Sequence, residues 1–328
     1  MISTPLRLGL VLTGAYDRST DPRIATRQRL DLVLAAEAAG FDSVWMGEHY
    51  LGAEAPWLQN ISFMSYLAGV TERVDLGLFV IAPLHGLFEL AEQLATLDIV
   101  SGGRAAACFV RGWRKKEFAA FGIPYASAGK GLEEDVDLIL RLWRGDEVSA
   151  SGVNQFDRVQ IGPRPLRSPE EMLFMGGSSE HAAKQAGRLG RPFIHSSHLS
   201  IDEAEALTAQ YRAAGGRAPY AIVRQLYVAD SSAAAIADAA PTVGAYYKVY
   251  AEWGLGSAPA VTQEFETAAQ TRFVIGDPSA CIGQLKRYVA RLNVSAVLCR
   301  IGWPGLSHEK TLRAIELAGS EIMPALRT

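Results

Sequence analysis

The sequence has few cysteines, and their placement argues against a disulfide framework or a thiolate metal site. Only Cys108, Cys281 and Cys299 occur among 328 residues, and no two form a Cys-x-x-Cys pair. Two of them stand in apolar, strand-like runs, which favours buried, reduced thiols. His195 and His198 are three residues apart, but no acidic or further histidine cluster accompanies them, so no metal site is expected.

A large net charge and long hydrophobic runs are also missing. The formal net charge is −3 and there is no long basic segment, which disfavours nucleic acid and anionic membranes as partners. No apolar run reaches the length of a membrane span, and the apolar run at 6–12 lacks the charged lead of a signal peptide. Apolar residues make up 49% of the chain, so we expect a cytoplasmic protein with a large core.

Three common enzyme signatures are absent as well. The chain has no Gly-x-Ser-x-Gly elbow, no Gly-x-x-x-x-Gly-Lys-Ser/Thr loop and no Gly-x-Gly-x-x-Gly fingerprint. These absences argue against a serine hydrolase, a P-loop nucleotide hydrolase and a Rossmann dinucleotide enzyme.

Strand-like and helix-like segments alternate along the whole chain. Eight apolar runs are typical of buried parallel strands, and the segments between them have helical periodicity. The expected strands are residues 6–12, 43–47, 74–81, 105–110, 172–176, 192–196, 220–229 and 295–301. Eight such units predict a (β/α)8 TIM barrel formed as one domain by residues 1–328, with a doubly wound sheet as the alternative.

Two segments interrupt this rhythm. Residues 147–167 alternate in polarity and are rich in glycine and proline, which predicts a hairpin-like excursion before strand five. Residues 231–272 form a long insertion between strands seven and eight. We interpret it as a lid or pocket wall, with a satellite helix on the side of the barrel as the alternative.

Three candidate functional groups stand at the carboxyl ends of expected strands, where parallel barrels place their active sites. Arg111 follows strand four, and Gly177, Ser178 and Ser179 lie between strand five and a helix, a combination suited to an anion such as phosphate. His49 follows strand two and is a candidate for proton transfer. Each group also has a purely structural interpretation. Arg111 could be a surface charge, the glycine-serine segment a turn capped by a serine, and His49 a histidine that is hydrogen-bonded within the barrel wall.

Nearby charges are more ambiguous. Lys130 is either a second cation for the same anion or a solvated residue at the start of a helix. Glu48 either orients a neighbouring group or pairs with an arginine in the barrel. We expect the run Arg114-Lys115-Lys116 to be a solvated face.

Together these segments resemble the bacterial luciferase-like flavin monooxygenase family over nearly the whole chain. The resemblance rests on AAEAAGFDSVWMGEHY (35–50), LATLDIVSGGR (94–104), RGWRKKEFAAFG (111–122), MGGSS (175–179) and PGLSHEKTLRAIELAGSEIMPAL (304–326). It implies a barrel that binds FMN, in which reduced FMN and O2 give a C4a-(hydro)peroxide that oxygenates a small organic substrate. It also implies a separate NAD(P)H:flavin reductase and a homodimer through helices two and three, where Ala68, Gly69, Ala91 and Ala95 are small.

The resemblance also assigns site residues. It places Arg111, Gly177, Ser178 and Ser179, with Lys130, at the FMN phosphate, and His49 at the reactive edge of the flavin as the catalytic residue. It places Phe79 and Val110 beside the cofactor and implies a non-proline cis peptide near Phe79–Val80.

The chain departs from the family pattern at a few positions. Tyr50 replaces a second histidine, Cys108 and Val110 replace glycines before the arginine, and Trp113 is bulky. Trp113 either walls the substrate pocket or packs under the lid. Two alternatives remain: an F420-dependent oxidoreductase on the same fold, and a non-catalytic luciferase-like subunit.

Overall fold

Eight parallel strands form a closed barrel in the computed structural model, which describes residues 6–217, 220–255 and 271–327. The strands pair in the order β1-β2-β3-β4-β7-β8-β9-β11, and β11 pairs with β1 to close the sheet. They are β1 (Arg7–Leu12), β2 (Ser43–Met46), β3 (Asp75–Ile81), β4 (Ala105–Val110), β7 (Leu173–Gly177), β8 (Phe193–His195), β9 (Ala221–Val228) and β11 (Ala296–Arg300). All eight coincide with predicted strands, so the (β/α)8 barrel is confirmed.

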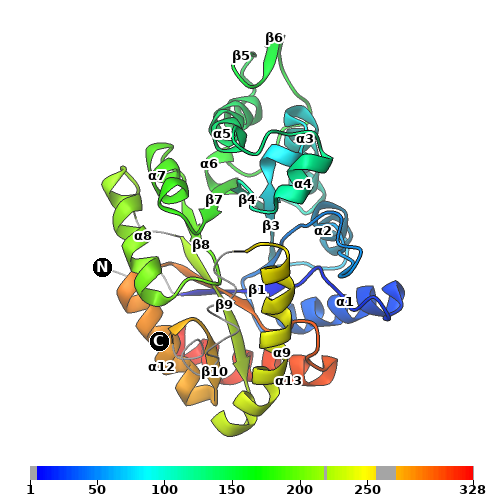
Figure 1. The fold of residues 1–328 in the computed structure, drawn as a ribbon, viewed down its shortest axis with the longest axis vertical. Helices are drawn as coiled ribbons and strands as arrows, with labels where there is room; N and C mark the ends of the chain where they lie inside the picture. The colour runs from blue at the N-terminus through cyan, green and yellow to red at the C-terminus, as the bar shows by residue number, and fades with distance from the viewer. Residues whose placement is uncertain (1–5, 218–219, 256–270, 328) are drawn as a thin grey trace.

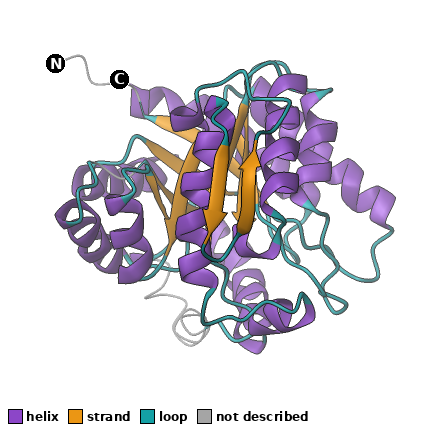
Figure 2. Ribbon diagram, turned by 90° about the horizontal axis from the view of Figure 1, so that it is seen from above, coloured by secondary structure: helices purple, strands orange, loops and turns teal. Residues whose placement is uncertain are grey.

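Helices surround the barrel on its outer side (Figure 1, Figure 2). On α5, the predicted apolar stripe of Leu132, Val136 and Ile139 is buried, and Asp277 caps α12 as expected. None of the helices within the described ranges is long and apolar enough to cross a membrane. The helices are α1 (Pro22–Ala38), α2 (Asn60–Ala68), α3 (Leu87–Val100), α4 (Lys115–Ala120), α5 (Ala128–Arg144), α6 (Pro169–Met172), α7 (Glu180–Arg188), α8 (Ile201–Ala213), α9 (Ser232–Glu252), α12 (Pro278–Leu292), α13 (His308–Leu317) and α14 (Met323–Arg327), with a 3₁₀ helix at Ala82–Leu84 and a π-helix at Ala318–Ile322.

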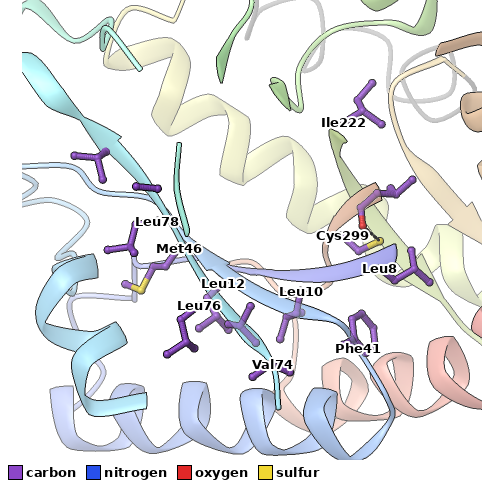
Figure 3. Packing of buried hydrophobic residues seen from close by; sticks show 14 of the residues in the cluster. Leu8, Leu10, Leu12, Phe41, Met46, Val74, Leu76, Leu78, Ile222 and Cys299 are labelled. Carbon is purple, nitrogen blue, oxygen red and sulfur yellow. Dashed lines mark hydrogen bonds between the residues drawn. The ribbon is translucent and has the colours of Figure 1, made fainter. Parts of the chain in front are cut away.

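Side chains alternate along the strands between two apolar layers. Leu10 and Leu12 of β1 pack in the layer beneath the helices (Figure 3), whereas Val11 faces the barrel interior. The largest interior side chain is Trp45, whose ring centroid lies 5.2 Å from that of Phe79. Gly77 makes room for it, since a Cβ there would lie 2.1 Å from the Trp45 ring. The three cysteines are free and buried, as predicted.

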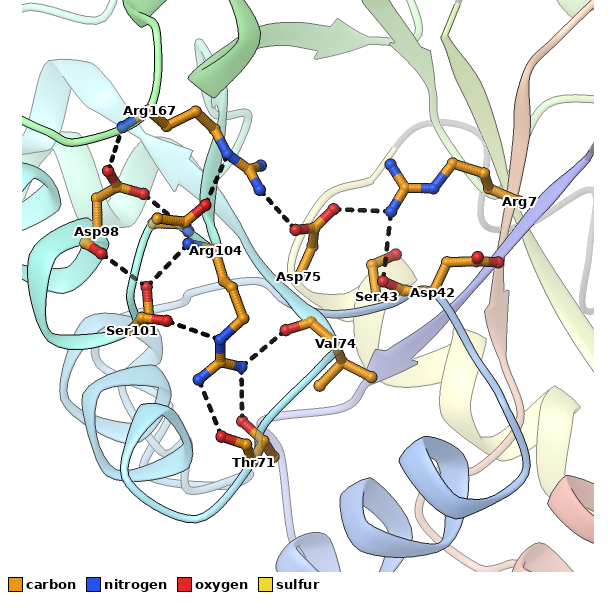
Figure 4. A network of polar contacts seen from close by, with 12 residues as sticks. Arg7, Asp42, Ser43, Thr71, Val74, Asp75, Asp98, Ser101, Arg104 and Arg167 are labelled. Carbon is orange, nitrogen blue, oxygen red and sulfur yellow. Dashed lines mark hydrogen bonds and ion pairs between the residues drawn. The ribbon is translucent and has the colours of Figure 1, made fainter. Parts of the chain in front are cut away.

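The family signature at 94–104 builds the face of the barrel where the strands begin (Figure 4). Buried Asp98 accepts backbone hydrogen bonds from Ala105, at the start of β4, and from Arg167. Arg104 donates to backbone carbonyls of the loop that leads into β3. Asp75 pairs with Arg167 at 2.6 Å and with Arg7 at 2.7 Å. This signature is therefore structural and lies at the opposite end of the strands from the candidate site.

Both predicted interruptions are present. Residues 147–167 contain the antiparallel hairpin of β5 (Val148–Ser151) and β6 (Gln155–Val159), which projects at the top of Figure 1. The insertion at 231–272 begins with α9, and its residues 256–270 lie outside the described ranges. A short strand that was not expected, β10 (Val274–Gly276), pairs with β9.

The expected cis peptide near Phe79–Val80 is wrong. The one cis peptide bond of the described residues joins Gly162 to Pro163. Phe79 therefore continues β3 with ordinary trans geometry and is paired with Cys108 of β4 in the sheet.

Gly77→Ala is expected to lower the free energy of unfolding by about 1–3 kcal/mol, because the added methyl group overpacks the interior against Trp45. Gly283→Ala is the matched control. It lies exposed in α12, where an added Cβ meets nothing within 4 Å, and should raise that free energy by up to about 1 kcal/mol. Urea unfolding measures both, and equal effects would contradict the packing argument.

Candidate active site

A pocket of about 290 Å³ opens where the barrel strands end. Seven of the eight barrel strands contribute a lining residue, residues 47–49 directly after β2 do so for the eighth, and α9 adds Tyr246, Tyr247 and Tyr250. The described part of the long insertion is therefore a pocket wall rather than a satellite helix. The predicted site residues that line this pocket are His49, Phe79, Val110, Arg111, Gly177, Ser178 and Ser179.

Arg111 lies at one end of the pocket, beside the start of α7. A Cβ at Gly129 would lie 3.7 Å from Arg111 Cδ and 3.4 Å from Nε2 of His181, in the first turn of α7, so these groups are close neighbours. Arg111 is exposed and donates a hydrogen bond of 2.7 Å to the Tyr125 hydroxyl. The N-terminus of α7 presents backbone N–H groups and a positive dipole end. Guanidinium and helix start together suit a phosphate.

Two glycines bring the serines to this end of the pocket. A Cβ at Gly176 would lie 2.7 Å from Cys108 Sγ, and one at Gly177 would lie 2.7 Å from the Ala182 side chain. Strand β7 can therefore pass directly into α7, where the Ser179 side chain caps the helix by accepting from the Ala182 N–H. Ser178 is exposed at the same turn.

Of the two residues that replace glycines before Arg111, one borders the pocket. Val110 lines it, whereas Cys108 packs in the barrel interior, where burial raises the pKa of its thiol. Cys108 is therefore a neutral packing residue, and Val110 is the replacement that a bound cofactor would meet.

His49 is held by a carboxylate that the sequence reading missed. Glu117 of α4 is buried, and its Oε1 lies 3.1 Å from His49 Nδ1 and accepts the Tyr50 backbone N–H at 2.8 Å. Arg114 lies 3.5 Å from the same oxygen and is only 3% exposed. The expectation of a solvated face is thus wrong for Arg114, although it holds for Lys115 and Lys116, which are exposed.

Aromatic rings surround His49 on several sides. The ring centroids of Trp57, Trp113, Trp253 and Tyr250 lie 4.9, 5.5, 5.4 and 5.9 Å from that of the imidazole. Trp113 lines the pocket, so the pocket-wall reading holds for it. Trp253 also covers the Arg114 guanidinium at 4.0 Å, which extends the wall to the buried ion pair behind His49.

Glu48 forms a second buried pair next to His49. Its carboxylate lies 3.0 Å from His85 Nε2, accepts the Ile81 N–H at 2.6 Å, and accepts the Tyr50 hydroxyl at 3.3 Å. Its partner is therefore a histidine rather than an arginine. Tyr50, at the position of the family's second histidine, connects the Glu48 and Glu117 carboxylates.

Three other candidates are placed differently. Lys130 is exposed on α5 and is not among the residues that line the pocket, so its role as a second phosphate cation stays a prediction. His195 and His198 line the pocket. Burial and Arg224 lower the pKa of His195 to about 3, and burial, with nearby arginines, lowers the pKa of His198 to about 4, so both are neutral at neutral pH.

Barrel and pocket define an enzyme whose cavity opens where its parallel strands end. Residues 6–294 match the luciferase-like monooxygenase family model, and the chain belongs to this family. The fold is that of monooxygenase RslO1 from Streptomyces bottropensis, with a TM-score of 0.80 and 21% identity over 97% of this chain and 99% of that one.

Curated relatives indicate the cofactor class. The oxygenase component of flavin-dependent trigonelline monooxygenase from Acinetobacter baylyi is 27% identical, over 91% of this chain and 89% of the relative. An F420-dependent glucose-6-phosphate dehydrogenase from Amycolatopsis mediterranei is 29% identical, over 58% of this chain and 60% of the relative. The chain is therefore an oxidoreductase of the flavin or F420 class.

The His85–Glu48 pair predicts a pH-dependent stability. Burial acts to lower the pKa of His85, but the hydrogen bond and charge of Glu48 outweigh burial and raise it. A histidine whose pKa is raised by folding stabilises the fold fully below about pH 6.5 and loses that contribution as the pH rises through the folded-state value. His85→Gln should therefore flatten the fall in unfolding free energy from about pH 6 to 9. Denaturant titrations test this, and parallel pH profiles would contradict it.

Proposed function

We propose that this protein is a monooxygenase that uses reduced FMN and O2 to oxygenate a small organic substrate. The observation that carries the proposal is one pocket with two chemically distinct ends. Arg111 and the α7 N-terminus form one end, and the His49–Glu117 pair stands among aromatic rings elsewhere in the same pocket. Bound reduced FMN would supply the electrons that activate O2.

The residues at the first end fit the phosphate of FMN. Arg111 contributes a charged fork, Ser178 and Ser179 contribute hydroxyls, and the first turn of α7 contributes backbone N–H groups. Gly177 lets the chain approach a ligand closely. We assign Val110 and Phe79, which line the pocket, to the side of the cofactor.

His49 would transfer or hold a proton at the reacting end. Its Nδ1 is engaged by Glu117, which leaves Nε2 as the ring nitrogen that can exchange a proton with a bound molecule. Because Glu117 also accepts from the Tyr50 backbone and lies beside Arg114, the carboxylate is fixed in place and orients the imidazole. The aromatic wall would exclude water from this region.

FMN is favoured over F420 because the flavin-dependent relative aligns with a larger share of this chain than the F420-dependent relative does. The flavin-dependent relative matches 91% of this chain, and the F420-dependent relative matches 58%. A non-catalytic subunit is the weaker alternative, because this chain has Arg111, the glycine-serine turn and the His49–Glu117 pair in one pocket.

A separate NAD(P)H:flavin reductase would supply the reduced cofactor. The name of the flavin-dependent relative, an oxygenase component, supports this part of the proposal.

Arg111→Ala is expected to weaken binding of FMN and reduced FMN by about 1.5–3 kcal/mol, the value of a charged hydrogen bond. Arg188→Ala, at the far end of α7 and paired with Glu133, is the matched control and should bind FMN as the wild type does. Anaerobic calorimetry with FMN, reduced FMN and F420 measures these affinities. Unchanged FMN binding in Arg111→Ala would remove the phosphate assignment, and preference for F420 would favour the dehydrogenase alternative.

His49→Ala is expected to retain FMN binding and to lose the pH dependence of cofactor reoxidation. The reduced complex is mixed with O2 in a stopped-flow instrument across about pH 5 to 8, where histidine changes charge, and the return of oxidised FMN is followed. A wild-type profile that persists in His49→Ala would contradict the proton-transfer role. His181→Ala, near Arg111, serves as a control for loss of a pocket histidine elsewhere.

A homodimer through α2 and α3 remains part of the proposal, and Gly69 is the one exposed residue of the four predicted contacts. Ala68, Ala91 and Ala95 are buried within the chain itself, so they pack these helices onto the barrel. Tyr66 in α2 and Val70 after it are 47% and 40% exposed and are better candidates for a subunit contact. Sedimentation should show a dimer at micromolar concentration that Tyr66→Glu dissociates; a wild-type monomer would exclude it.

A further inference from the structure

Arg300 is a cation of the pocket that pairs with no carboxylate among the described residues. It ends β11 and lines the pocket beside α9, with its guanidinium carbon 5.8 Å from the Tyr246 ring centroid. Its Nε is buried without a hydrogen-bond partner. In the part of the chain that the structure describes, no carboxylate pairs with its guanidinium, and the ionisable groups coupled to it are three tyrosines and His198. A guanidinium has five N–H donors, and leaving a buried charge unpaired is costly.

Arg300 cannot share an anion with Arg111. Around the closed barrel, β4 and β11 are separated by four strand positions out of eight, which places their ends on opposite sides of the pocket. Arg111 and the α7 N-terminus are therefore one anion site, and Arg300 is a second, separate one. The cofactor phosphate assigned to Arg111 leaves Arg300 for another ligand.

Tyrosine hydroxyls surround Arg300, and the further cations Arg224 and Arg272 act on His198 in the same region. The Tyr246 and Tyr250 hydroxyls are 2.9 Å apart, and the Tyr247 hydroxyl accepts from Gln225 at 2.7 Å. His198 faces the same region, and its lowered pKa keeps it uncharged. Among the residues that the structure describes, no carboxylate neutralises the guanidinium, whereas several hydroxyls can add hydrogen bonds to a bound anion.

Tyr250 connects this region to His49. Its ring centroid lies 5.9 Å from the His49 imidazole, while its hydroxyl contacts Tyr246, over which the Arg300 guanidinium lies. A molecule held at Arg300 would therefore extend along an aromatic wall toward the proposed reacting end.

We propose that the substrate is an organic carboxylate, whose carboxylate binds Arg300 through two parallel N–H···O bonds while its carbon skeleton lies against the aromatic wall. The planar fork of arginine matches carboxylate geometry. This proposal rests on the proposed oxygenase function for its reaction, but the binding site itself does not require it.

Benzoate is the probe, and benzyl alcohol is its neutral counterpart. Calorimetry with the FMN-saturated protein should show binding of benzoate and much weaker binding of benzyl alcohol. Arg300→Met should weaken benzoate binding about 10- to 100-fold and leave FMN affinity unchanged. Arg111→Met should do the reverse, weakening FMN binding while benzoate binding to the free protein persists. Arg313→Met, on the exposed face of α13, should change neither affinity.

Folding of the variant is checked independently. Since methionine removes an unpaired buried charge at similar length, Arg300→Met without ligand should unfold at the same or a higher temperature than the wild type. Unchanged benzoate affinity in Arg300→Met, or loss of benzoate binding only in Arg111→Met, would overturn the proposal. Tighter binding of benzenesulfonate than of benzoate would overturn the carboxylate assignment. If the wild-type protein binds benzoate through Arg300 but does not bind FMN, the proposed oxygenase function is contradicted while the carboxylate site at Arg300 stands.

Discussion

Closure of the parallel sheet is the constraint on which the rest of this structure depends. Because β11 hydrogen-bonds to β1, all eight strands begin at one face and end at the other. The two faces differ in how their arginine side chains are paired. Where the strands begin, Arg7 and Arg167 both pair with Asp75 (Figure 4). Where they end, Arg111 bonds to a tyrosine hydroxyl and Arg300 to no described carboxylate. The first face is internally neutralised, and the second is left ready for ligands.

Most of the barrel could be predicted from the sequence because its signals are local. Each strand is a short apolar run, and helices such as α5 carry their buried residues on one stripe, so period and length suffice to place them. The glycine-serine turn and Arg111 were also predictable, because strand ends of a parallel barrel converge whatever the intervening sequence. The position of His49 in the pocket was predictable for the same reason, because His49 follows the end of β2.

What could not be predicted depends on how short, irregular segments fold back. Arg114 reads as a surface charge and Glu117 gives no signal, since α4 has only six residues and no apolar stripe reveals that its inner face covers His49. Tyr250 and Trp253 come from an insertion roughly 200 residues away in sequence from His49, and no local pattern connects them. The cis peptide was expected from resemblance alone, and the backbone of β3 does not have it.

Trp45 has a consequence for how molecules enter and leave. It fills the middle of the barrel against Phe79 and Phe174, and the ion pairs among Arg7, Asp75 and Arg167 cover the end below it. The barrel axis is therefore closed, and any ligand of the pocket has to enter from the face where the strands end. One indole ring thus determines from which side the pocket is reached, although it does not itself line that pocket.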